Sequence, residues 1–190
     1  SGRKLGLWFD PTVPICRIVA SSPSLPKPIK FYAIANVWRY DRPQKGRFRE
    51  FWQADLELIG SSRPEADAEV IKIVWECMKA AGIEGVYFKI NSRELVESFI
   101  AKASIPPEKK FEVFRSLDKL GKVGEGEVAK EMERYGIGKE KINKLLKFIK
   151  GEDRPSEAEK LSRIMTMLRQ MGVKNVQIDF SIVRGIDYYT

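Results

Sequence analysis

Two strand-forming segments lie on either side of a short charged segment, and this pattern constrains the fold more than any other feature of the sequence. Residues 31–40 (FYAIANVWRY) are rich in aromatic and β-branched residues, and residues 51–59 (FWQADLELI) alternate imperfectly between apolar and polar side chains. The segment between them, residues 41–49 (DRPQKGRFR), contains Pro43 and Gly46, which are typical of loops. The order strand, loop, strand predicts an antiparallel β-hairpin with a long, charged tip.

The remaining periodicity predicts an α+β fold in which helices flank an antiparallel β-sheet. Apolar residues recur at helical spacing in some segments and gather in short strand-like runs in others. In residues 5–20, two prolines argue against a helix through that stretch. The predicted helices cover residues 67–81, 92–103 (with Ser92 as the N-cap) and 156–171, and the predicted strands cover residues 86–90 and 176–182.

A lysine- and glutamate-rich segment divides the predicted core into two parts. Residues 105–154 are expected to form a small helical insertion, with Leu145 and Phe148 among its core positions. Residues 1–104 are then the first part of the core, and residues 155–190 are its return segment. Because the sequence stops on an unfinished strand-like segment, we expect it to be part of a longer protein.

The composition excludes several classes of protein and of site. The 190 residues are 43% hydrophobic, which is enough to bury a core, but they include no histidine. Histidine-dependent catalytic triads and histidine-rich zinc sites are therefore excluded within this chain. Two distant cysteines, Cys16 and Cys77, suggest neither a disulfide framework nor a metal pair, so no protein-bound metal is expected. No apolar run is long enough to span a membrane, and a reducing, cytoplasmic setting is expected.

The predicted hairpin tip concentrates positive charge. Lys and Arg number 34 and Asp and Glu 26, which gives the chain a net charge of +8. In residues 39–49 the only acidic residue is Asp41, against five basic residues. A polyphosphate ligand would relieve the repulsion between these positive charges, since one arginine guanidinium can donate two hydrogen bonds to the oxygens of a phosphate. The alternative is a solvated loop whose charges interact with little. The basic residues are Arg39, Arg42, Lys45, Arg47 and Arg49.

Three polar residues, Gln53, Asp55 and Glu57, lie on one face of the predicted return strand, because side chains alternate with a period of two. They form either a solvent-exposed face or the floor of a polar pocket. From the sequence alone the solvent face is the more common outcome. Similarly, Asp10 and Thr12, which lie on either side of Pro11, indicate a turn when considered alone.

Three blocks together resemble histidyl-tRNA synthetases, a family of class II aminoacyl-tRNA synthetases. Residues 38–57 resemble motif 2 of that class, a strand–loop–strand element that grips ATP. Residues 183–190 (VRGIDYYT) are similar to the histidine-specific motif of the family. Residues 10–14 (DPTVP) resemble more weakly the element that receives the amino group of the substrate. Residues 90–95 (INSREL) also resemble the family, whereas the insertion matches only as its variable part.

The resemblance implies a two-step reaction on histidine. The histidine carboxylate attacks the α-phosphorus of ATP to give histidyl-adenylate and pyrophosphate, and the histidyl group then passes to tRNA(His). ATP is implied as a substrate together with Mg²⁺, whose ligands the sequence does not identify. Residues 1–104 and 155–190 would belong to the catalytic core, and the full-length protein is expected to be a homodimer. The dimer-forming motif 1 and the adenine-binding motif 3 are not in the sequence.

The resemblance also implies a role for individual residues. Arg39 and Arg184 would hold the α-phosphate from two sides, and Arg47 is a candidate for the outer phosphates. Asp10 and Thr12 would receive the amino group of histidine. The other residues implied to bind histidine are Gln53, which helps to place it, Glu57 and Tyr188, which engage its imidazole, Tyr189, which lines the pocket, and Arg184.

Two alternatives belong to other classes of protein. One is a synthetase-like regulatory subunit of histidine biosynthesis, which senses histidine without aminoacylation activity and could lose the phosphate-binding arginines. The retention of both Arg39 and Arg184 argues against it. The other is a plain nucleic-acid-binding module, which predicts salt-sensitive RNA binding that is indifferent to histidine and ATP.

Overall fold

The computed structural model describes residues 2–152 and 158–183, and the chain forms two compact units that divide between Val70 and Ile71. The division falls within helix α2 (Pro64–Ala80). Both units combine strands with helices, so the predicted α+β class is confirmed. The predicted division into a core and an insertion at residues 105–154 stays a prediction.

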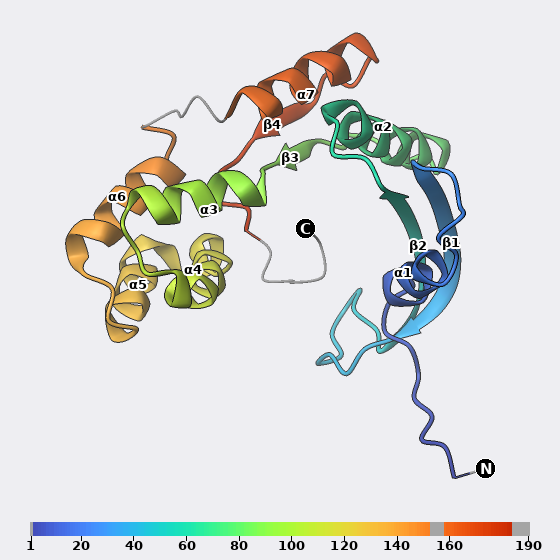
Figure 1. Ribbon diagram of the computed structural model, residues 1–190, viewed down its shortest axis with the longest axis horizontal. Helices are drawn as coiled ribbons and strands as arrows, with labels where there is room; N and C mark the ends of the chain where they lie inside the picture. Colours follow the sequence, from blue (N-terminus) through green and yellow to red (C-terminus); the bar gives the residue numbers. More distant parts are fainter. Residues whose placement is uncertain (1, 153–157, 184–190) are drawn as a thin grey trace. The chain divides into compact units, whose positions relative to one another are not determined.

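The first unit is built on the predicted hairpin. Strand β1 (Ile29–Trp38) pairs antiparallel with β2 (Glu50–Ile59) in unbroken register, from Ile29 opposite Ile59 to Trp38 opposite Glu50 (Figure 1). The backbone N–H of Arg39 donates to the carbonyl of Arg49 over 2.8 Å and extends the ladder by one step. The strand, the loop and the return strand therefore lie where the sequence predicts them.

Helix α1 (Thr12–Ala20) corrects the expectation that prolines exclude a helix from this stretch. Pro14 is the third residue of the helix, in the first turn, where a backbone N–H has no acceptor within the helix. A proline there loses no hydrogen bond and supplies a helical φ angle. Of residues 5–20, residues 5–11 lie outside the helix and have no regular secondary structure.

The second unit contains a parallel strand pair, which differs from the single antiparallel sheet expected from the sequence. Strand β3 (Phe88–Ile90) pairs with β4 (Val176–Ile178) in the same direction. The two strands are separated by a long helical connection, and a connection of that kind can return the chain for parallel pairing. Strand β4 ends at Ile178, four residues earlier than predicted, because a turn begins at Asp179.

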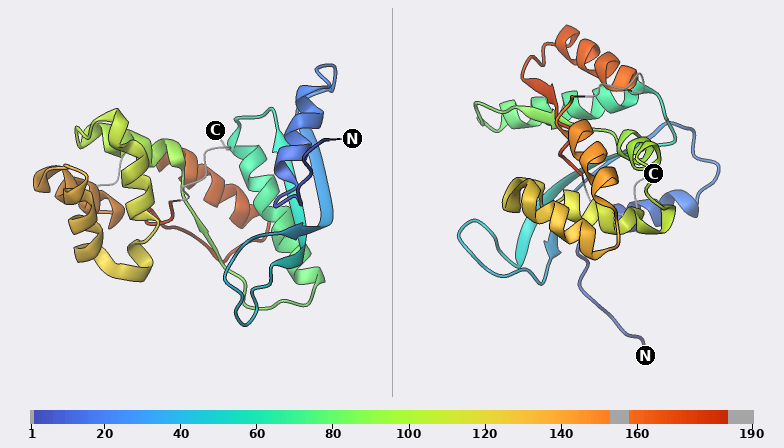
Figure 2. Two further views of the ribbon diagram at one scale, coloured as in Figure 1. Left: turned by 90° about the horizontal axis from the view of Figure 1, so that it is seen from below. Right: turned by 90° about the vertical axis from the view of Figure 1, so that its left-hand side faces the viewer.

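Helices make up most of the second unit, as predicted for residues 105–154. Figure 2 shows the helices that follow β3 from two further directions. Helix α5 is broken at Gly124, whose φ of 79° is not helical, so the glycine-rich stretch interrupts the helix there. The elements are α3 (Arg93–Lys102), the short 3₁₀ helix η1 (Pro107–Lys109), α4 (Lys110–Leu117), α5 (Leu120–Arg134), α6 (Lys139–Ile149) and α7 (Glu159–Gln170).

The helical core confirms the predicted apolar positions. Helix α6 packs against α3 and α5, and α4 packs against α5. Phe148 and Leu145 of α6 are fully buried, and Phe148 stacks on Phe99 of α3. Burying such side chains supplies the main favourable free energy of folding. In contrast, Ser92 lies at the N-cap of α3 as predicted, but its side chain makes no capping hydrogen bond.

Candidate functional site

The polar face of the hairpin is its covered face. Gln53 and Asp55 are half-buried and Glu57 is only 6% exposed. On the opposite face Tyr32 and Trp52 are 79% and 70% exposed. The solvent-face alternative, which the sequence alone favours, is therefore wrong for these three polar residues.

Small residues of β1 lie opposite the polar residues of β2. Ala35 pairs with Gln53, and Ala33 pairs with Asp55. Paired residues project to the same side of a sheet, and alanine extends by one carbon only. On this part of the covered face, Gln53 and Asp55 therefore extend farther from the sheet than the alanines opposite them.

Arg39 is held at the end of this face by several contacts. Its Nη2 donates to Oε1 of Gln53 over 2.5 Å, and its Nε donates to the backbone carbonyl of Phe9 over 3.1 Å. The guanidinium also lies 5.0 Å from the ring centroid of Phe51, a cation–π contact. The prediction that packing holds the Arg39 side chain is confirmed.

The segment before α1 is tied to the edge of β1. The backbone N–H of Trp38 donates to the carbonyl of Trp8 over 3.0 Å. The indole N–H of Trp8 donates to the carbonyl of Asn36 over 2.8 Å. These two bonds fix the chain just before Asp10, so this residue reaches the polar face of the hairpin.

Asp10 and Thr12 complete a buried polar cluster. Asp10 is 9% exposed and Thr12 is 2% exposed. The backbone N–H of Thr12 donates to Oδ1 of Asp10 over 2.8 Å, and its hydroxyl donates to Oδ2 of Asp55 over 3.3 Å. The other carboxylate oxygen of Asp10 lies 3.6 Å from Nη2 of Arg39. The structure therefore brings together Asp10, Thr12, Arg39 and Gln53, as the resemblance implies.

The cluster favours the ionised form of Asp10. Burial alone would raise the pKa of the Asp10 carboxyl. Hydrogen bonds from Thr12, the nearby charge of Arg39 and a hydrogen bond from Gln53 outweigh burial and hold the pKa below its ordinary value. Asp10 is consequently a carboxylate at neutral pH, and a carboxylate can accept hydrogen bonds from an ammonium group.

We expect this cluster to lose stability in acid. A carboxyl whose pKa is lower in the folded than in the unfolded state stabilises the fold above its unfolded pKa, and this contribution is lost as the pH falls through the folded pKa. The free energy of unfolding should therefore drop more steeply below about pH 4 in the wild type than in Asp10→Asn. Denaturant unfolding between pH 7 and pH 3 measures the difference. Parallel curves for the two proteins would contradict the assignment.

Arg47 makes its contacts within the hairpin tip. Its Nε lies 3.3 Å from Oδ2 of Asp41, and its backbone forms an isolated antiparallel bridge with Gln44. Arg49 packs its guanidinium over the ring of Tyr40 at 4.6 Å. The tip is therefore braced by its own residues, and Arg47 remains largely exposed, with 59% of its side chain accessible.

The predicted residues of the histidine-specific motif lie outside the described residues. These are Arg184, Tyr188 and Tyr189. Their roles, and the convergence of Arg39 and Arg184 on one phosphate, stay predictions. The start of the helix predicted at residue 156 also lies outside the described part of the chain.

Two residues of the cluster were not assigned to the site from the sequence. Asp55 accepts a hydrogen bond from the hydroxyl of Thr12, and the ring of Phe51 makes the cation–π contact with the guanidinium of Arg39. The period of two places both on the same face as Gln53, and this was the available signal. Within the described residues, no group of three or more Asp, Glu or Cys side chains could hold a metal ion. No helix there is long and apolar enough to cross a membrane.

Comparisons with known proteins identify the family of the chain. A family model described as histidyl-tRNA synthetase matches residues 1–190, the whole chain. The chain therefore belongs to the histidyl-tRNA synthetase family. It is 37% identical over 205 residues to the histidine–tRNA ligase of Aeropyrum pernix, and 36% identical over 208 residues to that of Pyrococcus horikoshii. It spans about half the length of these curated relatives, 47% and 48%, while all of the chain is covered.

Solved structures support the fold. The histidyl-tRNA synthetase of Nostoc sp. PCC 7120 superposes with a TM-score of 0.79 at 27% identity, covering 96% of this chain and 47% of that one. A protein from Bacillus halodurans C, described as an ATP phosphoribosyltransferase regulatory subunit/histidyl-tRNA synthetase, gives a TM-score of 0.78 at 21% identity. This match covers 96% of the present chain and 51% of the other, and it bears on the fold alone.

Proposed function

We propose that the complete protein activates histidine with ATP and transfers the histidyl group to tRNA(His). The observation that carries this proposal is the contact between the candidate phosphate-binding residue and two candidate histidine-binding residues. Nη2 of Arg39 lies 2.5 Å from Gln53 and 3.6 Å from Asp10. Adenylation needs an amino acid carboxylate next to the α-phosphate, so a cation that binds phosphate must lie close to groups that bind the amino acid.

The activation step needs no protein nucleophile. A carboxylate oxygen of histidine forms a bond to the α-phosphorus, and the bond from that phosphorus to the pyrophosphate oxygen breaks. Negative charge builds on the α-phosphate oxygens, and Arg39 would stabilise it with a donor that is already oriented. Arg184 would do so from the other side, and Arg47 would bind the outer phosphates.

Histidine would be bound by the polar face. Its ammonium group would donate to the carboxylate of Asp10 and to the hydroxyl oxygen of Thr12, and Gln53 would help to place it. Glu57 and Tyr188 would pair with the two imidazole nitrogens, with Tyr189 beside them. Analogues without these nitrogens would leave buried polar groups unpaired, at a cost of about 1–3 kcal/mol each.

ATP would bring Mg²⁺ on its phosphates, where the ion shields charge during the displacement. The described residues offer no cluster of acidic side chains for it, so we assign it no protein ligand. We also propose a homodimer for the complete protein, as the resemblance implies, and a cytoplasmic setting.

Histidine-dependent exchange of pyrophosphate into ATP tests the proposal on the complete protein. We expect exchange with histidine and none with histidinol phosphate or without an amino acid, followed by charging of tRNA(His). A protein that binds histidine in calorimetry but shows no exchange would instead be the histidine-sensing regulator. RNA binding that is unaffected by histidine and ATP, without exchange, would indicate the nucleic-acid-binding module.

A further inference from the structure

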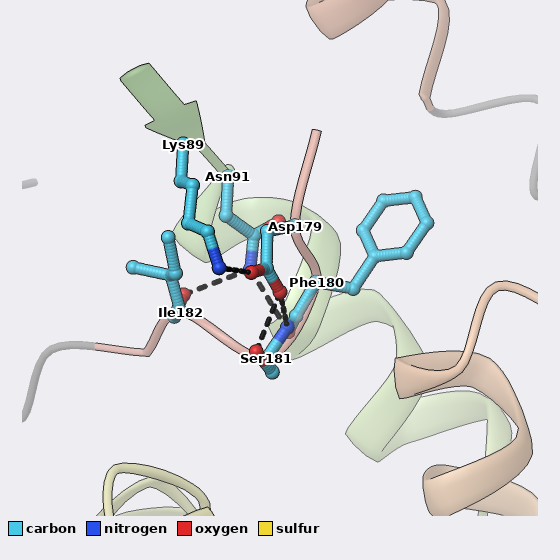
Figure 3. A network of polar contacts seen from close by, with 6 residues as sticks. All are labelled: Lys89, Asn91, Asp179, Phe180, Ser181 and Ile182. Carbon is cyan, nitrogen blue, oxygen red and sulfur yellow. Dashed lines mark hydrogen bonds and ion pairs between the residues drawn. The ribbon is translucent and has the colours of Figure 1, made fainter. Parts of the chain in front are cut away.

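A short turn leads from β4 to the last described residue of the chain. The backbone N–H of Ile182 donates to the carbonyl of Asp179 over 3.2 Å, which closes a four-residue turn. Oδ1 of Asp179 accepts from the backbone N–H of Ser181 over 3.0 Å and from its hydroxyl over 2.5 Å (Figure 3). The turn is thus stabilised from inside by its own first residue.

Asn91 clamps this turn from outside. It follows β3 directly, and Figure 3 shows its amide directed at the turn. Its Nδ2 donates to the carbonyls of Phe180 and Ile182, over 3.2 Å and 3.0 Å. Its Oδ1 accepts from the backbone N–H of Ser92 over 2.8 Å. The amide uses both of its hydrogens on backbone acceptors two residues apart, which fixes the path of the chain between them.

Two further contacts join the same segments. Nζ of Lys89 lies 2.9 Å from Oδ2 of Asp179, and the backbone N–H of Asp179 donates to the carbonyl of Ile90 over 3.0 Å. Burial alone would raise the pKa of Asp179, but hydrogen bonds from Ser181 and Lys89 outweigh it and hold the pKa below its ordinary value. The turn therefore carries a carboxylate that remains ionised at neutral pH.

The helical core holds the turn on its other side. Phe180 is buried, and its ring centroid lies 5.0 Å from that of Phe148 in α6. Val183 is 5% exposed. The chain is therefore fixed by packing as well as by hydrogen bonds up to Val183, and the next residue in the sequence is Arg184.

We propose that Asn91 is a positioning residue that fixes the path of the chain through the turn at residues 179–183, the point after which Arg184 follows in the sequence. The inference rests on the proposed function, in which Arg184 binds the α-phosphate. Reactions of this kind depend on the placement of the reacting groups, and an error of about 1 Å can cost about 100-fold in rate. Residues 90–95 matched the family in the sequence without an assigned role, and this clamp gives Asn91 one.

The test compares Asn91→Ala with Asn175→Ala in the complete protein. Asn175 is a matched control, because its Nδ2 also donates to a carbonyl across the same pair of segments, that of Val86, over 3.4 Å at an exposed position. We expect kcat for pyrophosphate exchange to fall about 10- to 100-fold in Asn91→Ala, with each KM within about threefold. Asn175→Ala should stay within about twofold of the wild type. Asn91→Ser, which keeps one donor, should lie between them.

Amide hydrogen exchange provides a readout that does not depend on activity. In Asn91→Ala we expect faster amide hydrogen exchange in residues 179–183 and unchanged exchange in α5. Equal kcat values and equal rates of amide hydrogen exchange in the two alanine variants would overturn the proposal. If the wild type itself shows no pyrophosphate exchange, the proposed function fails, and the hydrogen-exchange comparison still decides whether Asn91 orders the turn at residues 179–183. Should Asn91→Ala not fold, Asn91→Ser supplies both comparisons.

Discussion

Replacing Arg39 with alanine should abolish most of the activation chemistry. Removal of one pre-oriented donor from a developing anion typically costs about 10²- to 10³-fold in kcat, and we expect a loss of this size in histidine-dependent pyrophosphate exchange. The guanidinium is oriented by Gln53, Phe9 and the ring of Phe51, so no other side chain of the cluster can supply the same two-pronged donor. KM for ATP should change much less than kcat.

Two further variants separate charge, geometry and folding. Arg39→Lys keeps the positive charge but loses the fork, so its kcat should lie between those of the wild type and Arg39→Ala. Arg63→Ala removes a surface arginine of the same unit, whose side chain is 77% exposed and paired with Glu65, and it should stay within about twofold of the wild type. An Arg39→Ala protein with near-normal kcat would contradict the role assigned to this residue.

Of the substitutions proposed for this protein, Phe148→Ala should cause the largest decrease in the free energy of unfolding. The side chain is fully buried, stacks on Phe99 and packs against Phe180. Truncation of a buried phenylalanine to alanine costs about 3–5 kcal/mol, because it loses apolar burial and leaves a cavity. Chemical unfolding followed by circular dichroism measures the loss, and amide exchange should accelerate in α3 and α6.

Phe111→Ala is the matched control for this change. Phe111 lies in α4 of the same unit and is 54% exposed, so its removal leaves no enclosed cavity. We expect its free energy of unfolding to fall by less than about 1 kcal/mol. Equal effects of the two substitutions would show that α3 and α6 do not share the core described above.

The Phe148 contact also supports the turn that precedes Arg184 in the sequence. Phe180 follows Asp179 in the turn that Asn91 clamps, and it rests on Phe148. Loss of the aromatic contact should therefore loosen the turn before Arg184 as well as the helices. A Phe148→Ala protein that is assayed below its unfolding temperature should show reduced kcat in addition to reduced stability.

Local patterns were sufficient to predict most of the secondary structure. The hairpin strands, the helix ending near Ala80 and the apolar face of α6 follow from residue spacing over a few positions. The two prolines of residues 5–20 argue against a helix, yet α1 forms there, because Pro14 lies in its first turn and a proline at that position breaks no hydrogen bond. The length of β4 was overestimated because the turn at Asp179 depends on Ser181 and on the distant Asn91.

The sequence alone places Gln53, Asp55 and Glu57 on one face of a strand, because side chains alternate along any β-strand. It also determined the residue types available for phosphate and amino acid binding, and the family motifs. Which of the two faces is covered emerges only in the folded chain. The covering of the polar face depends on Asp10 and Thr12, which lie more than 40 positions before Asp55 in the sequence. Alternation within a strand carries no information about such distant partners.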